Sequence, residues 1–334
     1  MNKQQRNRRR WLVAILLPVL SLIACLYGVL YGSISIPLRE MMLILWGQEP
    51  SAYRTILMDL RVPRVIIGWL VGACLATAGA LLQGVMKNPL ADPGIIGVSA
   101  GGGITAMITM VMLPQLSYLL PITAFLGAFV TAVLIYLLAW DRGASPVKII
   151  LAGVAVNALL GALTNGIMVI YSDRVQAVLP WLSGGLNGRS WYHLEFVAPY
   201  AVVGLILSLF AIKPANILLL GDDSAQLLGQ RVEMNRLLII LLSAFLAGAA
   251  VSVAGLVGFV GLVIPHMIRL IIGEDYRFLL PFSMIGGGTL VVFADTVARS
   301  WFGSIELPVG ILLAVIGAPF FLFLLKRKGR FGLS

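Results

Sequence analysis

The chain has 334 residues, of which 60% are hydrophobic and only 11% are charged, and its formal net charge is +10. Soluble domains usually carry about 25% charged residues, so this composition excludes a soluble globular protein and indicates a polytopic membrane protein. The cations lie at the ends of apolar runs, which fits the positive-inside rule better than nucleic-acid binding.

A transmembrane helix needs roughly 20 apolar residues, and about ten segments of the chain are interpreted as spans. They cover about residues 11–32, 62–82, 93–113, 118–140, 147–170, 194–212, 236–256, 258–272, 278–300 and 305–325. An even number of spans places both termini on one side, and most Lys and Arg residues fall on that side, which predicts cytoplasmic termini. The expected fold is an all-α polytopic membrane protein, with residues 1–334 as a single transmembrane domain and 11–325 as its bundle.

The first apolar run, Trp11 to Tyr31, follows a basic N-terminus. A signal peptide is the competing interpretation. Because no small-residue cleavage site stands out, we expect a retained first helix.

The second span carries a stripe of small residues spaced four apart: Gly68, Gly72, Ala76, Ala80 and Gly84. Such stripes let helices pack at close range in lipid. The stripe predicts a helix in the middle of the bundle.

The segment 83–103 interrupts the apolar pattern with Pro89, Pro93, six glycines, Lys87 and Asp92. Broken backbone at membrane depth survives only where protein buries it or where it lines a watery cavity. A tight polar turn between two spans is one interpretation. The sequence favours a turn that also shapes a pathway or contacts a partner.

Five residues at spacings of three and four share one face of the fifth span, two of them polar amides. They are Asn157, Gly161, Thr164, Asn165 and Met168. Two interpretations stay open: hydrogen bonds between helices, or an uncharged pathway wall. The short turn before this span contains Ala144 and Ser145.

The longest inner loop, residues 213–235, contains a short predicted helix that Asp222, Asp223 or Ser224 can cap and Gly229 can end. A bare connector needs no such helix, and its apolar residues suggest a protein partner. The helix comprises Asp222, Asp223, Ser224, Ala225, Gln226, Leu227, Leu228 and Gly229.

A second glycine- and proline-broken stretch, residues 255–270, holds a place in the second half like that of 83–103 in the first. Five spans separate the two halves, so matching segments would run in opposite directions. This arrangement predicts a possible inverted repeat.

The chain offers little catalytic or metal-binding chemistry. Cys25 and Cys74 lie inside apolar runs as packing residues, and the two histidines, His193 and His266, lack companion zinc ligands. No P-loop motif occurs. An intramembrane enzyme is disfavoured because no nucleophile–base constellation is present.

Asp295 and Glu306 lie in or beside apolar spans, which raises the hypothesis of a proton relay. Arg299 follows Asp295 at i+4, so an ion pair near the outer surface is the simpler explanation. An energy-driven transporter without a nucleotide site must be powered by a separate ATPase subunit or by an ion gradient.

Several segments, nearly end to end and in order, resemble the FecCD permeases, the membrane subunits of ATP-binding-cassette (ABC) importers for ferric siderophores, haem and cobalamin. They are Leu60-Arg-Val-Pro-Arg64, Asn88-Pro-Leu-Ala-Asp-Pro-Gly-Ile-Ile-Gly-Val-Ser-Ala-Gly101, Gly258-Phe-Val-Gly-Leu-Val-Ile-Pro-His266, Ala294-Asp295 with Arg299, and Glu306-Leu-Pro-Val-Gly310.

The resemblance implies an alternating-access permease in the bacterial cytoplasmic membrane, paired with a second permease subunit of the same or a different kind. Two cytoplasmic ATPase subunits, which bind ATP and Mg, would dock on the coupling helix within 213–235, and the chain itself would hold no cofactor. An extracytoplasmic substrate-binding protein would meet Arg61, Arg64 and Arg299. The cytoplasmic gate would lie near Ala144 and Ser145.

The expected cargo is a ferric siderophore, on family frequency alone, with haem or cobalamin as the alternative. A proton-coupled secondary transporter is a less favoured hypothesis, because only Asp295 is a candidate relay group. We expect neither enzymatic activity in this chain nor nucleic acid as a partner.

Overall fold

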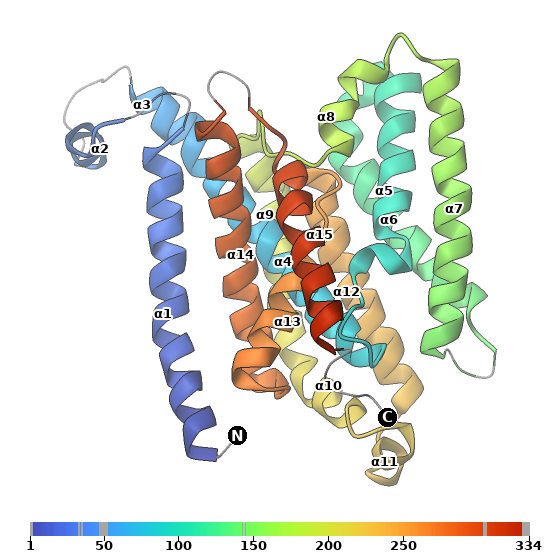
Figure 1. Cartoon of the computed structure of the whole chain (residues 1–334). Coiled ribbons are helices and arrows are strands. Elements are labelled where there is room, and N and C mark those ends of the chain that lie inside the picture. Colours follow the sequence, from blue (N-terminus) through green and yellow to red (C-terminus); the bar gives the residue numbers. More distant parts are fainter. Residues whose placement is uncertain are drawn as a thin grey trace.

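The computed structural model describes residues 3–328 except 33, 35, 47–52, 142, 144 and 303–305. Within these residues the chain is helical and contains no β-strand. Figure 1 shows a bundle of long helices, with short helices at its two ends. The all-α prediction is confirmed.

Each of the ten expected apolar segments corresponds to a helix. Among the described residues, seven helical segments are long and apolar enough to cross a membrane, and three apolar helices are shorter. The long segments contain α1 (Lys3–Leu30), α4 (Val62–Val85), α6 (Leu120–Leu138), α7 (Pro146–Ile170), α9 (Trp191–Phe210), α12 (Val232–Ala254) and α14 (Tyr276–Ser300). The shorter apolar stretches are α5 (Val98–Met107) with the π-turn Ile108–Met112, α13 (Val260–Ile272), and residues Val309–Phe323 of α15 (Val309–Lys328).

Short helices at the ends of the bundle separate into two groups. One end carries α2 (Leu38–Leu45), α3 (Tyr53–Thr55) and α8 (Leu179–Leu182), whereas the other carries α10 (Ile212–Leu218) and α11 (Asp222–Leu227) (Figure 1). The start of α1 and the last turn of α15 both lie on the same side of the bundle as α11. We call the end with α3 the outer end and the end with α11 the inner end, as the predicted topology implies.

Helix α4 lies at the centre of the bundle and packs against α14, α12, α13 and α9. A Cβ atom at Gly72 would overlap the carbonyl group of Gly287 on α14, and one at Gly79 would overlap that of Gly261 on α13. The backbones therefore touch where side chains are absent, which maximises van der Waals contact in a membrane. The prediction that the small-residue stripe makes this helix central is confirmed.

The segment after α4 is broken, as its glycines and prolines predicted. Lys87 takes a left-handed conformation (φ 48°), and the 3-10 turn Pro93–Ile96 begins at Asp92, whose Oδ1 accepts a hydrogen bond from Gly94 N at 2.9 Å. Gly97 (φ 81°) then allows α5 to begin at Val98, so the helix starts five residues later than the expected span.

The second broken stretch meets the first in the interior. Gly255 (φ 68°) and Phe259 (φ 67°) separate α12 from α13. Gln83 Nε2, at the end of α4, donates to the carbonyl groups of Gly261 at 3.2 Å and Leu262 at 3.3 Å. Protein groups thus satisfy these irregular segments, as backbone at membrane depth requires. The inverted repeat itself stays a prediction.

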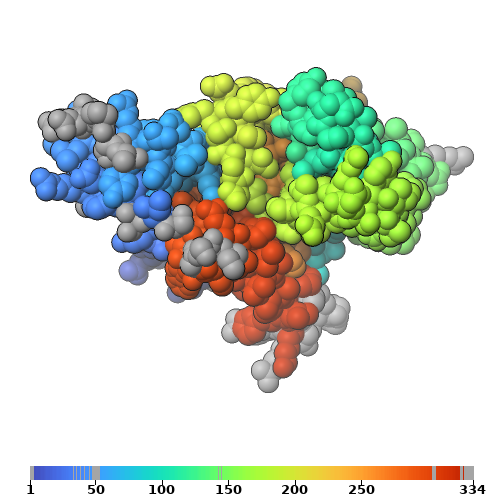
Figure 2. All heavy atoms as spheres, turned by 90° about the horizontal axis from the view of Figure 1, so that it is seen from above, coloured from blue at the N-terminus to red at the C-terminus, as the bar shows by residue number. Residues whose placement is uncertain are grey.

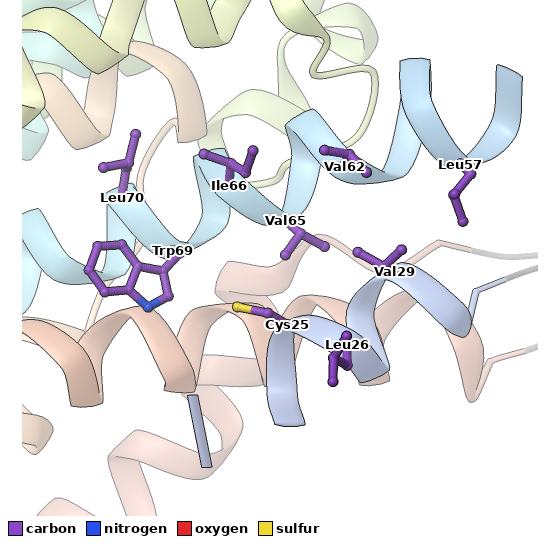
Figure 3. A pocket seen from close by; sticks show the side chains of 9 residues that line it. All are labelled: Cys25, Leu26, Val29, Leu57, Val62, Val65, Ile66, Trp69 and Leu70. Atoms are coloured by element: carbon purple, nitrogen blue, oxygen red, sulfur yellow. The ribbon is translucent and has the colours of Figure 1, made fainter. Parts of the chain in front are cut away.

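An apolar cavity of about 470 Å³ lies between α1 and α4. Figure 3 shows its lining side chains, among them Cys25 from α1 and Trp69 from α4. Both cysteines are free, and Cys74 is buried in the core. They act as packing residues, as expected.

Candidate functional site

A buried ion-pair cluster joins three segments at the outer end. Arg64, in the first turn of α4, binds Asp295 on α14 through two hydrogen bonds, Nε–Oδ2 and Nη2–Oδ1, both 2.9 Å long. Its Nη1 also lies 2.9 Å from Glu306 Oε2, which precedes α15. The side chains of Arg64 and Asp295 are only 9% and 5% exposed, whereas that of Glu306 is 27% exposed.

Arg299 lies farther from Asp295 than Arg64 does. The predicted i+4 ion pair is present, but Arg299 Nε is 3.6 Å from Asp295 Oδ2. The predicted ion pair is thus confirmed, but packing of α4 on α14 brings Arg64 closer, a second partner that the sequence did not reveal. A bidentate arginine–carboxylate pair is stronger and more directional than a single contact.

Arg61 and Arg299 hold the outer end of α1. Arg61 Nη1 donates to the carbonyl groups of Val29 at 3.1 Å and Leu30 at 2.7 Å, and Arg299 Nη2 donates to that of Gly28. The last carbonyl groups of a helix lack partners within it, and cations there are favourable. Both guanidinium groups therefore satisfy the C-terminus of α1.

The three arginines expected to dock a binding protein come together in the structure. Arg61, Arg64 and Arg299, with Arg189 and Glu306, line a cavity of about 220 Å³ at the outer end. Each of the three residues is nevertheless buried and makes the internal contacts described above. Figure 2 views this end of the bundle, where the first, middle and last parts of the chain meet at the surface.

Arg189 is a charged member of the cavity that the sequence analysis did not single out. It precedes α9, and its Nη1 lies 3.3 Å from His193 Nε2. Burial, and secondarily the charge of Arg64, lowers the pKa of Arg189. An isolated cation in a largely uncharged outer loop was the signal that could have revealed it. With Asp295 included, four arginines face two carboxylates, so the cluster carries an excess of two positive charges.

The α7 residues predicted to line a pathway are partly or fully exposed and make different contacts. Asn157 Nδ2 donates to Gly94 O at 3.0 Å, which ties α7 to the broken segment. Thr164 bonds to Leu160 O of its own helix, and Met168 packs beside the buried Met107 cluster. The expectation of hydrogen bonds between elements therefore holds for Asn157.

Asn165 differs from these residues because it lies on the exposed face of α7. This face is broad, since only 17% of the most apolar part of the helix is buried. Large apolar side chains on it are Leu151, Val154, Leu159, Leu163 and Val169.

Of the two gate residues, Ala144 lies outside the described residues. Ser145 is the N-cap of α7, and its Oγ accepts a hydrogen bond from Lys148 N at 3.3 Å. Pro146 follows at the first helical position, where its missing N–H costs nothing.

The expected inner helix exists as α11, with Gly229 (φ 75°) just beyond its end. The capping prediction was wrong: Gly221 is the N-cap, and no side chain caps the helix. Asp222 instead uses its carboxylate for ion pairs. Ala225 is fully buried, whereas Leu227 and Leu228 are 90% and 60% exposed. Asp223, Ser224 and Gln226 are also exposed.

Comparisons with known proteins first define the class of this bundle. A solved structure described as "an inward-facing conformation of a putative metal-chelate type ABC transporter" superimposes with a TM-score of 0.83 at 29% identity, covering 95% of this chain and 99% of that one. The bundle is thus an ABC transporter permease, an integral membrane transport subunit.

The family then follows from the sequence. Residues 19–327 match the FecCD transport family, and the chain belongs to it. It is 39% identical over 327 residues to the Fe(3+)-citrate import system permease protein YfmD of Bacillus subtilis, covering 97% of this chain and 98% of that protein. It is 42% identical over 281 residues to the cobalamin import system permease protein BtuC of Halobacterium salinarum, covering 84% of this chain and 75% of that one. The resemblance inferred from the motifs is confirmed.

Proposed function

We propose that this chain is the permease subunit of a binding-protein-dependent importer that carries ferric siderophores across the bacterial cytoplasmic membrane. The observation that carries the proposal is the placement of two unlike surfaces at opposite ends of one bundle. A cation-rich cavity lies at the outer end, and a short helix with exposed leucines lies at the inner end.

The inner surface suits a cytoplasmic ATPase subunit. Leu227 is 90% exposed on a helix that contacts its chain neighbours α10 and α12. An apolar side chain presented at the end of a bundle is stabilised by a partner that covers it. Partner ATPase subunits would hold ATP and Mg there, and their closure would drive alternating access.

The open face of α7 suits a second permease subunit. An exposed amide such as Asn165 is costly in lipid and is favourable against protein or water. A pathway between two permeases, with α7 on its wall, would place Asn165 in such surroundings. This arrangement retains the predicted pathway role for Asn165, whereas Asn157 supports the broken segment.

The outer cavity suits an acidic surface on a substrate-binding protein. Its excess of positive charge acts at a distance even though the arginines make internal contacts, because partly buried charges are screened less than exposed ones. Complementary charges then steer encounter and fix register more than they raise affinity. In this proposal, docking is favoured by the electrostatic potential of Arg61, Arg64 and Arg299, and no direct contact with their side chains is required.

Cargo identity is the finer part of the proposal. The similarity to a ferric citrate permease supports an iron chelate, and the similarity to a cobalamin permease makes cobalamin an alternative, beside haem.

The test is uptake of radiolabelled iron, offered as a panel of ferric siderophores and ferric citrate, in cells that lack this chain and in cells that express it again. We expect the wild type to restore uptake. Leu227→Asp should not restore it, whereas Asp141→Asn, a charge change outside α11, should. Immunoblots of membranes control for chain level. Iron uptake that is independent of the chain across the whole panel would refute the ferric-chelate assignment, and haem and cobalamin would then be tested in the same cells.

A further inference from the structure

One carboxylate joins three segments at the inner end of the bundle. Asp222 is the first residue of α11. Its Oδ1 accepts a hydrogen bond from Lys87 Nζ at 2.9 Å, and its Oδ2 accepts one from Arg236 Nη2 at 2.9 Å. Lys87 belongs to the broken segment after α4, and Arg236 belongs to α12. The coupling helix is therefore bonded to a segment 135 residues away in the chain.

Lys87 is held in place by an unusual backbone. Its φ of 48° lies in the left-handed region, which non-glycine residues rarely adopt. The turn is closed by hydrogen bonds from Lys87 N to Gly84 O at 3.2 Å and from Asn88 N to Gln83 O at 3.1 Å. This turn ends α4 and lets the lysine side chain reach Asp222.

The broken segment connects this turn to the interior. Ala91 N donates to Asn88 O at 3.1 Å, and Asp92 orders the following 3-10 turn. Gly94 O accepts from Asn157 of α7. Hydrogen bonds therefore connect the segment that carries Lys87 to α7, and a displacement of Lys87 can be transmitted along them.

Arg236 does not depend on Asp222 alone. Its Nη1 lies 2.6 Å from Glu233 Oε1, one turn earlier in α12. Its side chain is 3% exposed, whereas those of Asp222 and Lys87 are each 40% exposed. Neutralising Asp222 therefore leaves the buried Arg236 with a carboxylate and separates Lys87 from α11, so the fold should survive the change.

The ion pairs are present near neutral pH. Partial burial acts to raise the pKa of Asp222, but hydrogen bonds and charge from Lys87 and Arg236 outweigh it and hold the pKa below its ordinary value. The carboxylate is then ionised and accepts both bonds.

We propose that Asp222 is a positioning residue that transmits movement of α11 to the broken segment 86–97, and through it to α7, by way of Lys87. The inference rests on the proposed function, in which α11 receives the ATPase. A helix that touched only α10 and α12 would transmit force to its chain neighbours, whereas the Lys87 bridge applies it at the break between α4 and α5.

The test uses the complete complex of permease and ATPase subunits in proteoliposomes, with binding protein and ferric chelate. The variants are Asp222→Asn, Lys87→Gln and the two combined. Asp141→Asn and Arg277→Gln are matched controls for exposed inner ion pairs outside α11, since Asp141 bonds Lys148 at 2.6 Å and Arg277 bonds Asp275 at 2.8 Å. ATP hydrolysis and transport are measured in the same vesicles.

We expect Asp222→Asn and Lys87→Gln to retain ATPase subunits and to hydrolyse ATP, but to transport about five-fold less chelate per ATP, the lower range of allosteric coupling. The double variant should be no worse than the more severe single variant, because both remove the same link. Asp222→Glu should recover part of the loss, and the two controls should behave as wild type.

Normal transport per ATP in either single variant would overturn the inference, and so would additive losses in the double variant. Equal losses in the controls would also overturn it, since the effect would then be one of surface charge. A wild-type chain that binds no ATPase subunit is a different result, because it would refute the proposed function itself.

Discussion

Asp295→Asn should destabilise the protein more than any other single neutralisation of a carboxylate at the outer end. Its carboxylate is 5% exposed and accepts two 2.9 Å hydrogen bonds from Arg64, with Arg299 Nε at 3.6 Å. Removing one partner of a buried pair costs about 3–5 kcal/mol, mainly because the remaining charge is left unpaired. In the variant, Arg64 still has its ion pair with Glu306 at 2.9 Å. We therefore expect the free energy of unfolding to fall by about 3 kcal/mol, the lower end of that range.

Glu306→Gln is the matched control. It has the same chemistry and the same arginine partner, but Glu306 is 27% exposed and makes one contact with Arg64. The free energy of unfolding should fall by about 1 kcal/mol, as for the loss of a typical hydrogen bond to a partly solvated group. Arg64→Met should cost at least as much as Asp295→Asn, because it leaves the buried Asp295 carboxylate with only the longer contact to Arg299.

Denaturant titration in mixed micelles, followed by tryptophan fluorescence, measures these differences, since the chain has seven tryptophans. A double variant, Arg64→Met with Asp295→Leu, should cost less than the sum of its parts, because both charges leave together. The reasoning is refuted if Asp295→Asn stays within about 1 kcal/mol of wild type, a change typical of an exposed ion pair. It is also refuted if Glu306→Gln costs as much.

Three further outcomes are expected from single contacts. Gly72→Ala should lower the yield of folded protein, because the added Cβ would overlap a backbone carbonyl group. Gly161→Ala is the control and should not lower the yield, because its Cβ would meet nothing within 4 Å. Size-exclusion profiles of the two variants measure the difference. Asn157→Ala should cost about 1–3 kcal/mol, measured by the same titration, because Gly94 O loses its donor. The folded pKa of Asp222 lies below its unfolded value of about 3.9, so the stability difference between wild type and Asp222→Asn should be constant above about pH 5 and should vanish as the pH falls below that pKa.

Features that depend on local composition could be predicted from the sequence. Apolar runs located the ten helices, the small-residue stripe located the centre of the bundle at α4, and loop residues located α11. Hydropathy and spacing determine these features, and a single chain displays both directly. The short helix α2 was missed because its eight residues are too few for a span and lie between two obvious ones.

The partners of charged residues were harder to predict. Arg299 at i+4 was the visible candidate for Asp295, whereas the true main partner, Arg64, lies 231 residues earlier. Likewise, Asp222 looked like a helix cap, but its carboxylate is drawn to Lys87 and Arg236. In each case the pairing depends on which helix ends meet, and that is decided by backbone packing such as the contact of Gly72 with Gly287.

The two ion-pair sites are connected by one helix. Arg64 lies in the first turn of α4, and Lys87 lies two residues beyond its last, so the 24 residues of α4 span about 36 Å between them. The helix is close-packed on nearly all sides, and close-packed elements move as units more readily than they bend. A binding protein at the outer cavity and an ATPase at α11 would therefore act on opposite ends of the same rigid element. Because coupling between the binding free energies of two sites is reciprocal, loosening the inner link through Asp222 should weaken the effect that the binding protein has on the affinity for ATP, in the same complex in which it weakens transport per ATP.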